Sequence, residues 1–214
     1  GQFQISDPLF KRELRLTYED YHVYTSQIGL SDFNMKYDKG IMLTYSLPTS
    51  TDIMFEVVNG NGLAEFGSGG FFDKDPYKNY LGRITQGIGD FLSIGAVGYF
   101  GKEEIGFENM QVTNQAYFVG PDATLTYSDK LEINFQYILR HDDQVLTGMP
   151  GNPIMSDLTT NGILGEVVWS PQGDQSDWYA VGLYNYVNSD FDPADYHSVT
   201  LHAGYLLRRN LRLG

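Results

Sequence analysis

The sequence predicts an all-β protein, an antiparallel up-and-down transmembrane β-barrel, and three observations lead to that class. The first is a two-residue alternation over 130–140. It gives a strand one apolar wall and one polar wall, because successive side chains of a strand project to opposite faces. The second is the length of that strand, which matches the roughly 9–11 residues that a tilted strand needs to cross a bilayer. The third is an alternation of short turns and long loops, which is typical of outer-membrane barrels.

The composition narrows the class of protein. Hydrophobic residues make up 42% of the 214 residues, yet no run is long enough for a spanning helix, so a membrane role would have to use strands. A net charge of −13 argues against a nucleic-acid partner. The absence of cysteine fits passage through an oxidising periplasm, although many cytosolic proteins also lack it.

Turn-forming residues divide the chain into strands. We expect short connections at 48–51, 87–90, 128–130, 171–176 and 208–210, and long ones at 6–39, 60–78, 101–114, 141–160 and 188–196. Between them, strands are expected at 41–47, 52–59, 80–86, 91–100, 117–127, 131–140, 163–170, 177–187 and 197–207, with partial strands at 2–5 and 211–214. The start without Met predicts removal of a secretory signal. We interpret 1–214 as a single barrel domain truncated at both ends.

Alternation assigns the two faces of each strand. Lipid should meet the side chains of Leu131, Ile133, Phe135, Tyr137, Leu201, Ala203 and Tyr205. The lumen should be lined by Glu132, Asn134, Gln136, Thr200 and His202. The segment 177–187 is apolar on both faces, so its orientation stays open.

Aromatic residues gather where the expected strands meet turns. They are Tyr45, Phe91, Tyr99, Phe100, Tyr117, Phe118, Tyr127, Trp169, Trp178 and Tyr205. Rings with an apolar body and a polar tip favour the boundary between lipid and water, so we interpret them as aromatic girdles. The alternative is that they fill an ordinary β core.

Several short motifs occur in order near the start of the chain. Gly1-Gln2-Phe3 precedes a long loop with Arg12 and Glu13, followed by Asp-Lys-Gly-Ile-Met-Leu at 38–43 and Phe-Glu-Val-Val-Asn-Gly-Asn-Gly at 55–62. This order resembles the phosphate-selective porin family, porins O and P of Gram-negative outer membranes. The resemblance implies a barrel of about 16 strands, often a homotrimer, in which the first long loop folds into the pore. This chain would then be an internal fragment.

The sequence departs from that family in its charges. Such porins attract anions with a ladder of Arg and a cluster of Lys, and here only Lys11, Arg12 and Arg15 of the first loop are comparable. The mixed charges suit a general diffusion pore better than a phosphate filter. The residues that we expect to line the pore or its constriction are Lys11, Arg12, Glu13, Arg15, Glu56, Arg83, Glu132, Gln136, Arg140, Glu166 and His202.

The sequence contains only weak signals for catalysis or metal binding. Neighbouring residues of His141-Asp142-Asp143 point in different directions on a strand, and no nucleophile is placed beside them. Weak calcium binding is conceivable at Asp190, Asp192 and Asp195 or at Asp73 and Asp75, but both groups lack the spacing of an EF-hand. We therefore expect no enzyme, no catalytic residue, no metal site and no cofactor.

Three classes of function remain. The first is an outer-membrane porin for passive diffusion of small hydrophilic solutes or ions, with the lipid bilayer and those solutes as partners. In that reading the apolar and charged residues of 6–39 form a loop that constricts the pore, the alternative being an external cap or a subunit contact. The second class is a scaffold barrel around an electron-transfer or export partner. The third is an outer-membrane enzyme, for which we find no catalytic constellation.

Overall fold

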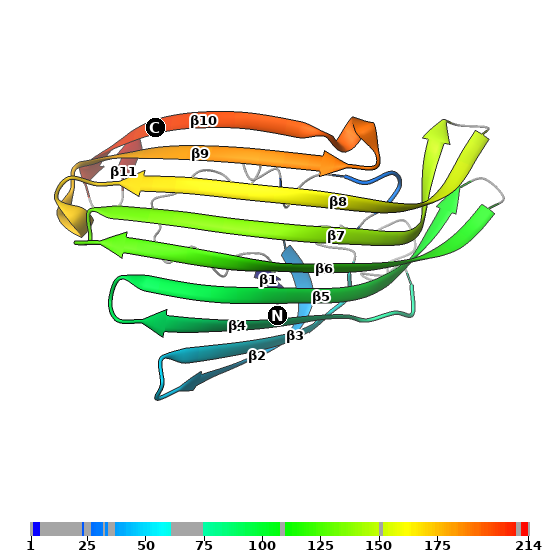
Figure 1. Cartoon of the computed structure of the whole chain (residues 1–214), viewed down its shortest axis with the longest axis horizontal. Helices are drawn as coiled ribbons and strands as arrows, with labels where there is room; N and C mark the ends of the chain where they lie inside the picture. Colours follow the sequence, from blue (N-terminus) through cyan, green and yellow to red (C-terminus); the bar gives the residue numbers. More distant parts are fainter. Residues whose placement is uncertain are drawn as a thin grey trace.

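The computed structural model describes residues 2–4, 23, 27–31, 33, 37–60, 75–107, 110–149, 152–208 and 211–213. Within them, eleven strands form one antiparallel sheet in which each strand pairs with its neighbours in the chain (Figure 1). The strands are β1 (Gln2–Gln4), β2 (Tyr37–Leu47), β3 (Thr51–Val58), β4 (Asn79–Ile88), β5 (Leu92–Phe107), β6 (Met110–Tyr127), β7 (Leu131–Met149), β8 (Asn152–Trp169), β9 (Trp178–Ser189), β10 (Tyr196–Arg208) and β11 (Leu211–Leu213).

The expected all-β, antiparallel up-and-down architecture is therefore confirmed. The sheet is a single curved layer, and its outermost strands β1 and β11 do not pair with each other within the described residues (Figure 1). Two short 3-10 turns, η2 (Gly173–Gln175) and η3 (Asp192–Ala194), lie in the connections after β8 and β9. No helix in the described part of the chain has the length and apolar character needed to cross a membrane.

Short connections join the strands at one end of the sheet, called here the turn end. The connection from β6 to β7 is a tight turn, in which Lys130 N donates a hydrogen bond to Tyr127 O at 3.1 Å. Its two central residues, Ser128 and Asp129, have φ of 51° and 54°. Positive φ at both positions is the type I′ pattern, whose twist matches that of the flanking strands. The opposite end of the sheet is called the loop end.

The prediction of long loops at 101–114 and 141–160 is wrong. The strands continue through them, so that β5 and β6 are separated only by 108–109 and β7 and β8 only by 150–151. Both stretches instead belong to strands that run past the rest of the sheet and bend at the loop end (Figure 1). The part of β5–β8 beyond Phe100, Tyr117, Leu139 and Asn161 is called the extension.

The alternation of side chains is confirmed within the sheet. On β7, Phe135 is 45% exposed and Gln136 is 0% exposed, because neighbouring residues point to opposite faces. The open orientation of β9 is also settled, since Tyr179, Val181 and Leu183 are buried while the ring of Tyr184 is exposed. We call the face with the buried side chains the inner face.

The same alternation corrects the expected girdles at two positions. Tyr99 and Phe118 are 4% exposed and pack edge to face on the inner face, with ring centroids 5.2 Å apart. Their chain neighbours Phe100 and Tyr117 are exposed on the outer face. An aromatic pair next to each other on a strand therefore contributes one ring to each face.

The buried apolar side chains lie on the inner face, in three clusters. The largest contains Phe33, Val58, Leu81, Val97, Tyr99, Ala116, Phe118, Ile138, Leu164 and Leu183. The second lies in the extension and contains Ile28, Ile105, Val145, Leu146, Leu158 and Ala194. The third, near the turn end, contains Val168, Tyr179 and Val181. Phe33 and Ile28 belong to the connection between β1 and β2, so described residues of this connection pack against the inner face.

Candidate functional site

A set of buried polar side chains follows the inner face from β3 to β9, and we call it the polar wall. Its members are Glu56, Arg83, Glu103, Asn114, Asp122, Thr124, Glu132, Asn134, Gln136, Arg140, Asp142, Thr160, Glu166 and Asn185. Each has less than a tenth of its surface exposed. Buried polar groups are stable only when bonded, so the contacts of this wall decide what it can do.

Arg140 on β7 contacts several groups at once. Its Nε and Nη2 donate to the two carboxylate oxygens of Asp142 at 2.5 and 2.8 Å, which is a bidentate ion pair. The guanidinium also lies over the ring of Phe118, with Cζ 5.0 Å from the ring centroid. Arg140 and Asp142 are two residues apart on one strand, and this spacing places them on the same face.

Arg140 also reaches the connection between β1 and β2. Its Nη2 donates to Ser31 Oγ at 3.0 Å, and its Nη1 donates to the carbonyl oxygen of Phe33 at 3.3 Å. Ser31 Oγ donates in turn to Glu103 Oε1 at 2.6 Å. Asn114 completes the network, because its Nδ2 donates to Glu103 at 2.9 Å and to Asp142 at 3.0 Å. One connected network therefore joins β5, β6 and β7 to residues 31 and 33.

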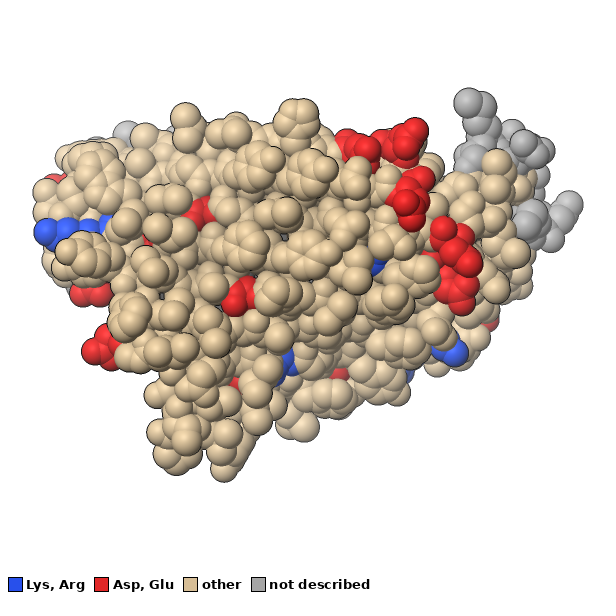
Figure 2. Space-filling view, viewed as in Figure 1, with Lys and Arg blue, Asp and Glu red and all other residues tan. Residues whose placement is uncertain are grey.

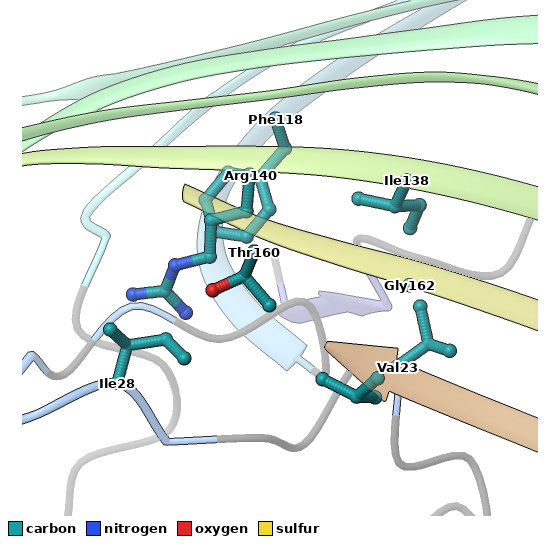
Figure 3. A pocket seen from close by; sticks show the side chains of 8 residues that line it. Val23, Ile28, Phe118, Ile138, Arg140, Thr160 and Gly162 are labelled. Atoms are coloured by element: carbon teal, nitrogen blue, oxygen red, sulfur yellow. The ribbon is translucent and has the colours of Figure 1, made fainter. Parts of the chain in front are cut away.

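Further contacts between the first connection and the sheet, both hydrogen-bonded and apolar, lie beside this network (Figure 3). Leu30 N donates to Leu146 O at 2.9 Å, and Ile28 is fully buried among the apolar residues of the extension. A Cβ on Gly162 would lie 2.8 Å from Val23 Cγ1, so glycine allows the close approach of Val23 to β8. The cavity left between Val23, Ile28 and Arg140 has a volume of about 10 Å³, which is the room that one water molecule needs.

A second buried ion pair lies closer to the turn end. Arg83 Nη1 and Nη2 donate to the two carboxylate oxygens of Asp122 at 2.6 and 2.8 Å, and Arg83 Nε donates to Thr85 Oγ1 at 3.1 Å. Arg83 is on β4 and Asp122 on β6, so the pair crosses β5. It does so at Gly95, where an added Cβ would lie 2.5 Å from Asp122 Oδ1. Glycine therefore provides the space for this pair.

A third group alternates amide and carboxylate side chains across β6, β7 and β8. Asn134 Nδ2 donates to Glu132 Oε1 and to Glu166 Oε2, both at 3.0 Å. Thr124 Oγ1 donates to the side-chain oxygen Oδ1 of Asn134 at 2.9 Å. One amide group thus holds two carboxylates on the same face. The polar wall as a whole combines both signs of charge with fixed hydrogen-bond geometry.

Glu56 on β3 differs from the other members of the polar wall. Its side chain is fully buried, and neither carboxylate oxygen has a hydrogen-bond partner within the described residues. The nearby Asp38 on β2 is also buried, but its carboxylate accepts hydrogen bonds from Lys39 N and Gly60 N, each at 2.6 Å. Glu56 therefore adds nothing to the stability of the fold through hydrogen bonding.

The outer face has the opposite chemistry. Its exposed aliphatic and aromatic side chains, called the apolar band, include Ile41, Leu43, Ile53, Phe55, Ile84, Ile94, Val119, Leu125, Ile133, Phe135, Val167, Val199 and Leu201. Leu201 is 82% exposed, far more than a soluble protein needs to leave to water. Figure 2 shows few charged side chains over the middle of the sheet, while acidic ones gather at the loop end. The exposed acidic residues there are Glu104, Asp157, Asp190, Asp192 and Asp195.

Exposed aromatic rings bound the apolar band on both sides. A turn-end row consists of Tyr127, Trp169, Trp178 and Tyr205. In it the two indoles pack edge to face at 4.8 Å, and Trp178 pairs with Tyr205 across β9 and β10. A loop-end row consists of Tyr80, Phe100, Tyr117 and Tyr186, and the first three of these are paired directly across neighbouring strands.

The separation of the two aromatic rows can be estimated on β6. Tyr117 and Tyr127 lie ten residues apart on this strand, which corresponds to about 33 Å along its axis. A strand tilt of about 40° reduces this to a height of about 25 Å, the height of the apolar band of outer-membrane barrels. The outer face therefore has both the composition and the height of a surface in contact with lipid.

The structure brings together most of the pore-lining residues predicted from the sequence. Glu56, Arg83, Glu132, Gln136, Arg140 and Glu166 all belong to the polar wall. His202 on β10 lies on the same face but is only half-buried, with Nε2 3.3 Å from Tyr179 Oη. Lys11, Arg12, Glu13 and Arg15 lie outside the described residues.

Sequence reasoning missed Ser31, Glu103, Asn114 and Asp142. Glu103, Asn114 and Asp142 lie in stretches expected to be loops, and continuing the two-residue alternation past Phe100 and Arg140 would have placed them on the inner face. Nothing in the sequence pattern indicates that Ser31 contacts Arg140.

Among the described residues, no group of three or more His, Asp or Glu side chains is placed to hold a metal ion. No family model, curated protein or solved structure matches this chain.

Proposed function

We propose that this chain forms part of the wall of an outer-membrane pore through which small hydrophilic solutes or ions diffuse passively. The observation that carries the proposal is the apolar band between two aromatic rows about 25 Å apart. A continuous exposed apolar surface of this height is costly in water and favourable in lipid. The polar wall on the opposite face supplies the charged and amide groups that a hydrated passage needs.

The contacts of the two wall arginines support a general diffusion pore over a phosphate filter. The guanidinium of Arg83 is bonded to Asp122, and the guanidinium of Arg140 is bonded to Asp142. A guanidinium that is already bonded bidentately to a carboxylate has fewer donors left for an anionic solute. The resemblance to the phosphate-selective porins, the outer-membrane location and assembly as a homotrimer remain predictions.

The alternative proposal is a scaffold barrel around an electron-transfer or export partner, whose strands would look nearly the same. Glu132, Gln136 and Glu166 are at most 3% exposed, so the inner face is covered along this part of the sheet. The structure contains one chain, so this covering comes from the chain's own atoms and does not separate a pore from a scaffold.

Reconstitution of the full-length gene product in a planar bilayer distinguishes the two candidates. A pore gives stepwise currents, and a salt gradient across the membrane then reports its ion preference. Insertion is checked separately with the two tryptophans of this chain, Trp169 and Trp178, both in the turn-end row. In a variant with no other tryptophan, lipids brominated near the headgroup should quench indole fluorescence more strongly than lipids brominated at the chain ends. Insertion without currents would contradict the pore and support the scaffold.

A further inference from the structure

We propose that Arg140, with Asp142, Glu103 and Asn114, forms a clasp that holds residues 28–31 and 33 against the inner face and thereby keeps the passage narrow. The inference deepens the proposed function, since it names the side chains that set the width of the pore. It rests on the hydrogen bonds that Arg140 of the wall donates to Ser31 and Phe33 of the connection between β1 and β2.

The clasp has a rigid half within the wall. Asp142 bonds the Arg140 guanidinium through two parallel hydrogen bonds, and this fixes the plane and direction of the fork. The Phe118 ring supports the guanidinium from one side. Asn114 joins Asp142 to Glu103 on the neighbouring strands. The remaining guanidinium hydrogens therefore point toward the connection without further ordering of the wall.

The other half of the clasp belongs to the connection. Ser31 Oγ accepts from Arg140 Nη2 and donates to Glu103, so this one hydroxyl bonds to both charged groups. The Phe33 carbonyl oxygen accepts from Arg140 Nη1. Hydrogen bonds to charged groups that are buried as deeply as these are the strong ones. On either side, Ile28 and Phe33 bury their apolar side chains among wall residues.

The Arg83–Asp122 pair provides a matched control for the clasp. Both are bidentate Arg–Asp pairs on the inner face, and the two arginines are 7% and 5% exposed. Arg83 donates hydrogen bonds to Asp122 and Thr85 and none to the described residues 28–31 and 33. Loss of either arginine leaves a buried aspartate, so the two variants differ chiefly in the contact with the connection.

The test uses cysteine labelling, because the chain contains no cysteine. A reporter cysteine replaces the fully buried Ile28, and its reaction with a hydrophilic thiol reagent is timed in the reconstituted full-length gene product. Arg140→Met should accelerate the reaction by about tenfold or more, given the loss of two hydrogen bonds to a charged group. Arg140→Lys should behave similarly, because an ammonium cannot reproduce the fork. Arg83→Met should leave the rate within about twofold.

A second reporter separates release of the connection from general loosening of the fold. Val181→Cys lies in the separate cluster near the turn end and is 2% exposed before substitution. Its labelling rate should not change in Arg140→Met. Equal acceleration at both reporter positions, or equal acceleration by Arg140→Met and Arg83→Met at position 28, would overturn the clasp.

A milder variant decides the question if Arg140→Met does not fold. Ser31→Ala removes the hydroxyl from the connection and leaves the Arg140–Asp142 pair in place. It should accelerate labelling at position 28, whereas Thr124→Ala, which removes another buried hydroxyl from the polar wall, should not. No acceleration in Ser31→Ala would contradict the proposal.

Conductance separates failure of the clasp from failure of the proposed function. If the unmodified protein conducts, Ser31→Ala and Arg140→Met should increase the unit conductance, and unchanged conductance with faster labelling would show that the segment does not set the width. If the unmodified protein inserts but does not conduct, the pore proposal fails, and the labelling rates still decide whether the clasp holds the segment.

Discussion

The middle of β5–β8 and the extension of the same four strands differ in the polarity of their outer faces. In the middle, the outer face carries exposed Val119 and Phe135, and the inner face holds polar residues such as Gln136 together with the largest apolar cluster. In the extension, the outer side chains of β5 and β6 next to the loop-end row are polar or charged, as in Glu104, and the inner face combines an apolar cluster with buried polar residues such as Glu103. The inner face is therefore mixed in both regions, whereas the polarity of the outer face changes with its surroundings.

The change in polarity of the outer face indicates where the proposed membrane ends. Outer residues change from apolar to polar between Phe100 and Lys102 on β5 and between Tyr117 and Gln115 on β6, and these residues are paired across the two strands. The change therefore follows a row across the sheet and coincides with the loop-end aromatic row. Beyond that row the outer side chains of β5 and β6 are polar, as on the solvent face of an antiparallel sheet in a soluble protein.

The largest expected effect comes from the apolar cluster of the extension. Leu146 is fully buried, and Leu146→Ala should lower the free energy of unfolding by about 2–5 kcal/mol through lost burial and a cavity. The control is Met155→Ala, because Met155 is paired with Leu146 across the strands but is 52% exposed. Denaturant unfolding in lipid vesicles measures both. Equal losses would show that the extension has no core of its own.

The next effect tests the boundary on the outer face. Val119 and Thr113 are both exposed on the outer face of β6, on opposite sides of the loop-end row. Val119→Arg should destabilise the protein in lipid by about 1–3 kcal/mol, because it places a charge inside the hydrocarbon region, between the loop-end row and the midplane. Thr113→Arg should change the stability by no more than about 0.5 kcal/mol, as at other exposed surface positions. Similar losses for both variants would remove the basis for placing the membrane between the two aromatic rows.

The last effect concerns the inner face in the middle of the sheet. Gly95→Val should displace the Arg83–Asp122 pair and cost about 1–3 kcal/mol, as overpacking does elsewhere. Gly98→Val on the same strand points to the other face, where an added Cβ has no atom within 4 Å, so its stability should be unchanged or slightly higher. A stable Gly95→Val variant would mean that the polar wall rearranges easily, which a fixed pore lining should not do.

The fold could be predicted from the sequence because its determinants are local. Period-two alternation identified both faces of β7 and β10, and turn residues identified the meander. On β7 the extension is hard to recognise because a β-bulge interrupts the alternation after Asp142, where Gln144 adopts a φ of 66°. After it, the consecutive residues Val145 and Leu146 are both buried, which a strict alternation does not allow.

The candidate site was predictable only in part, for a different physical reason. Arg83, Glu132 and Arg140 could be assigned to one face, because each position follows from its own strand. Their partners could not be assigned, since Asp122 pairs with Arg83 across an intervening strand that only a glycine leaves open. The Ser31–Arg140 contact is harder still, because no pattern links residues so far apart in the chain.

The distance between Ser31 and Arg140 in the sequence also has a consequence for the order of folding. Each strand pair in the sheet joins neighbours in the chain, so most of the wall can form hairpin by hairpin with short loop closures. The Ser31–Arg140 hydrogen bond spans 109 residues, and its acceptor and donor meet only after β5, β6 and β7 are in register. The connection between β1 and β2 should therefore dock onto the inner face last. During assembly the protein should pass through a state in which the wall is complete and the passage is still wide.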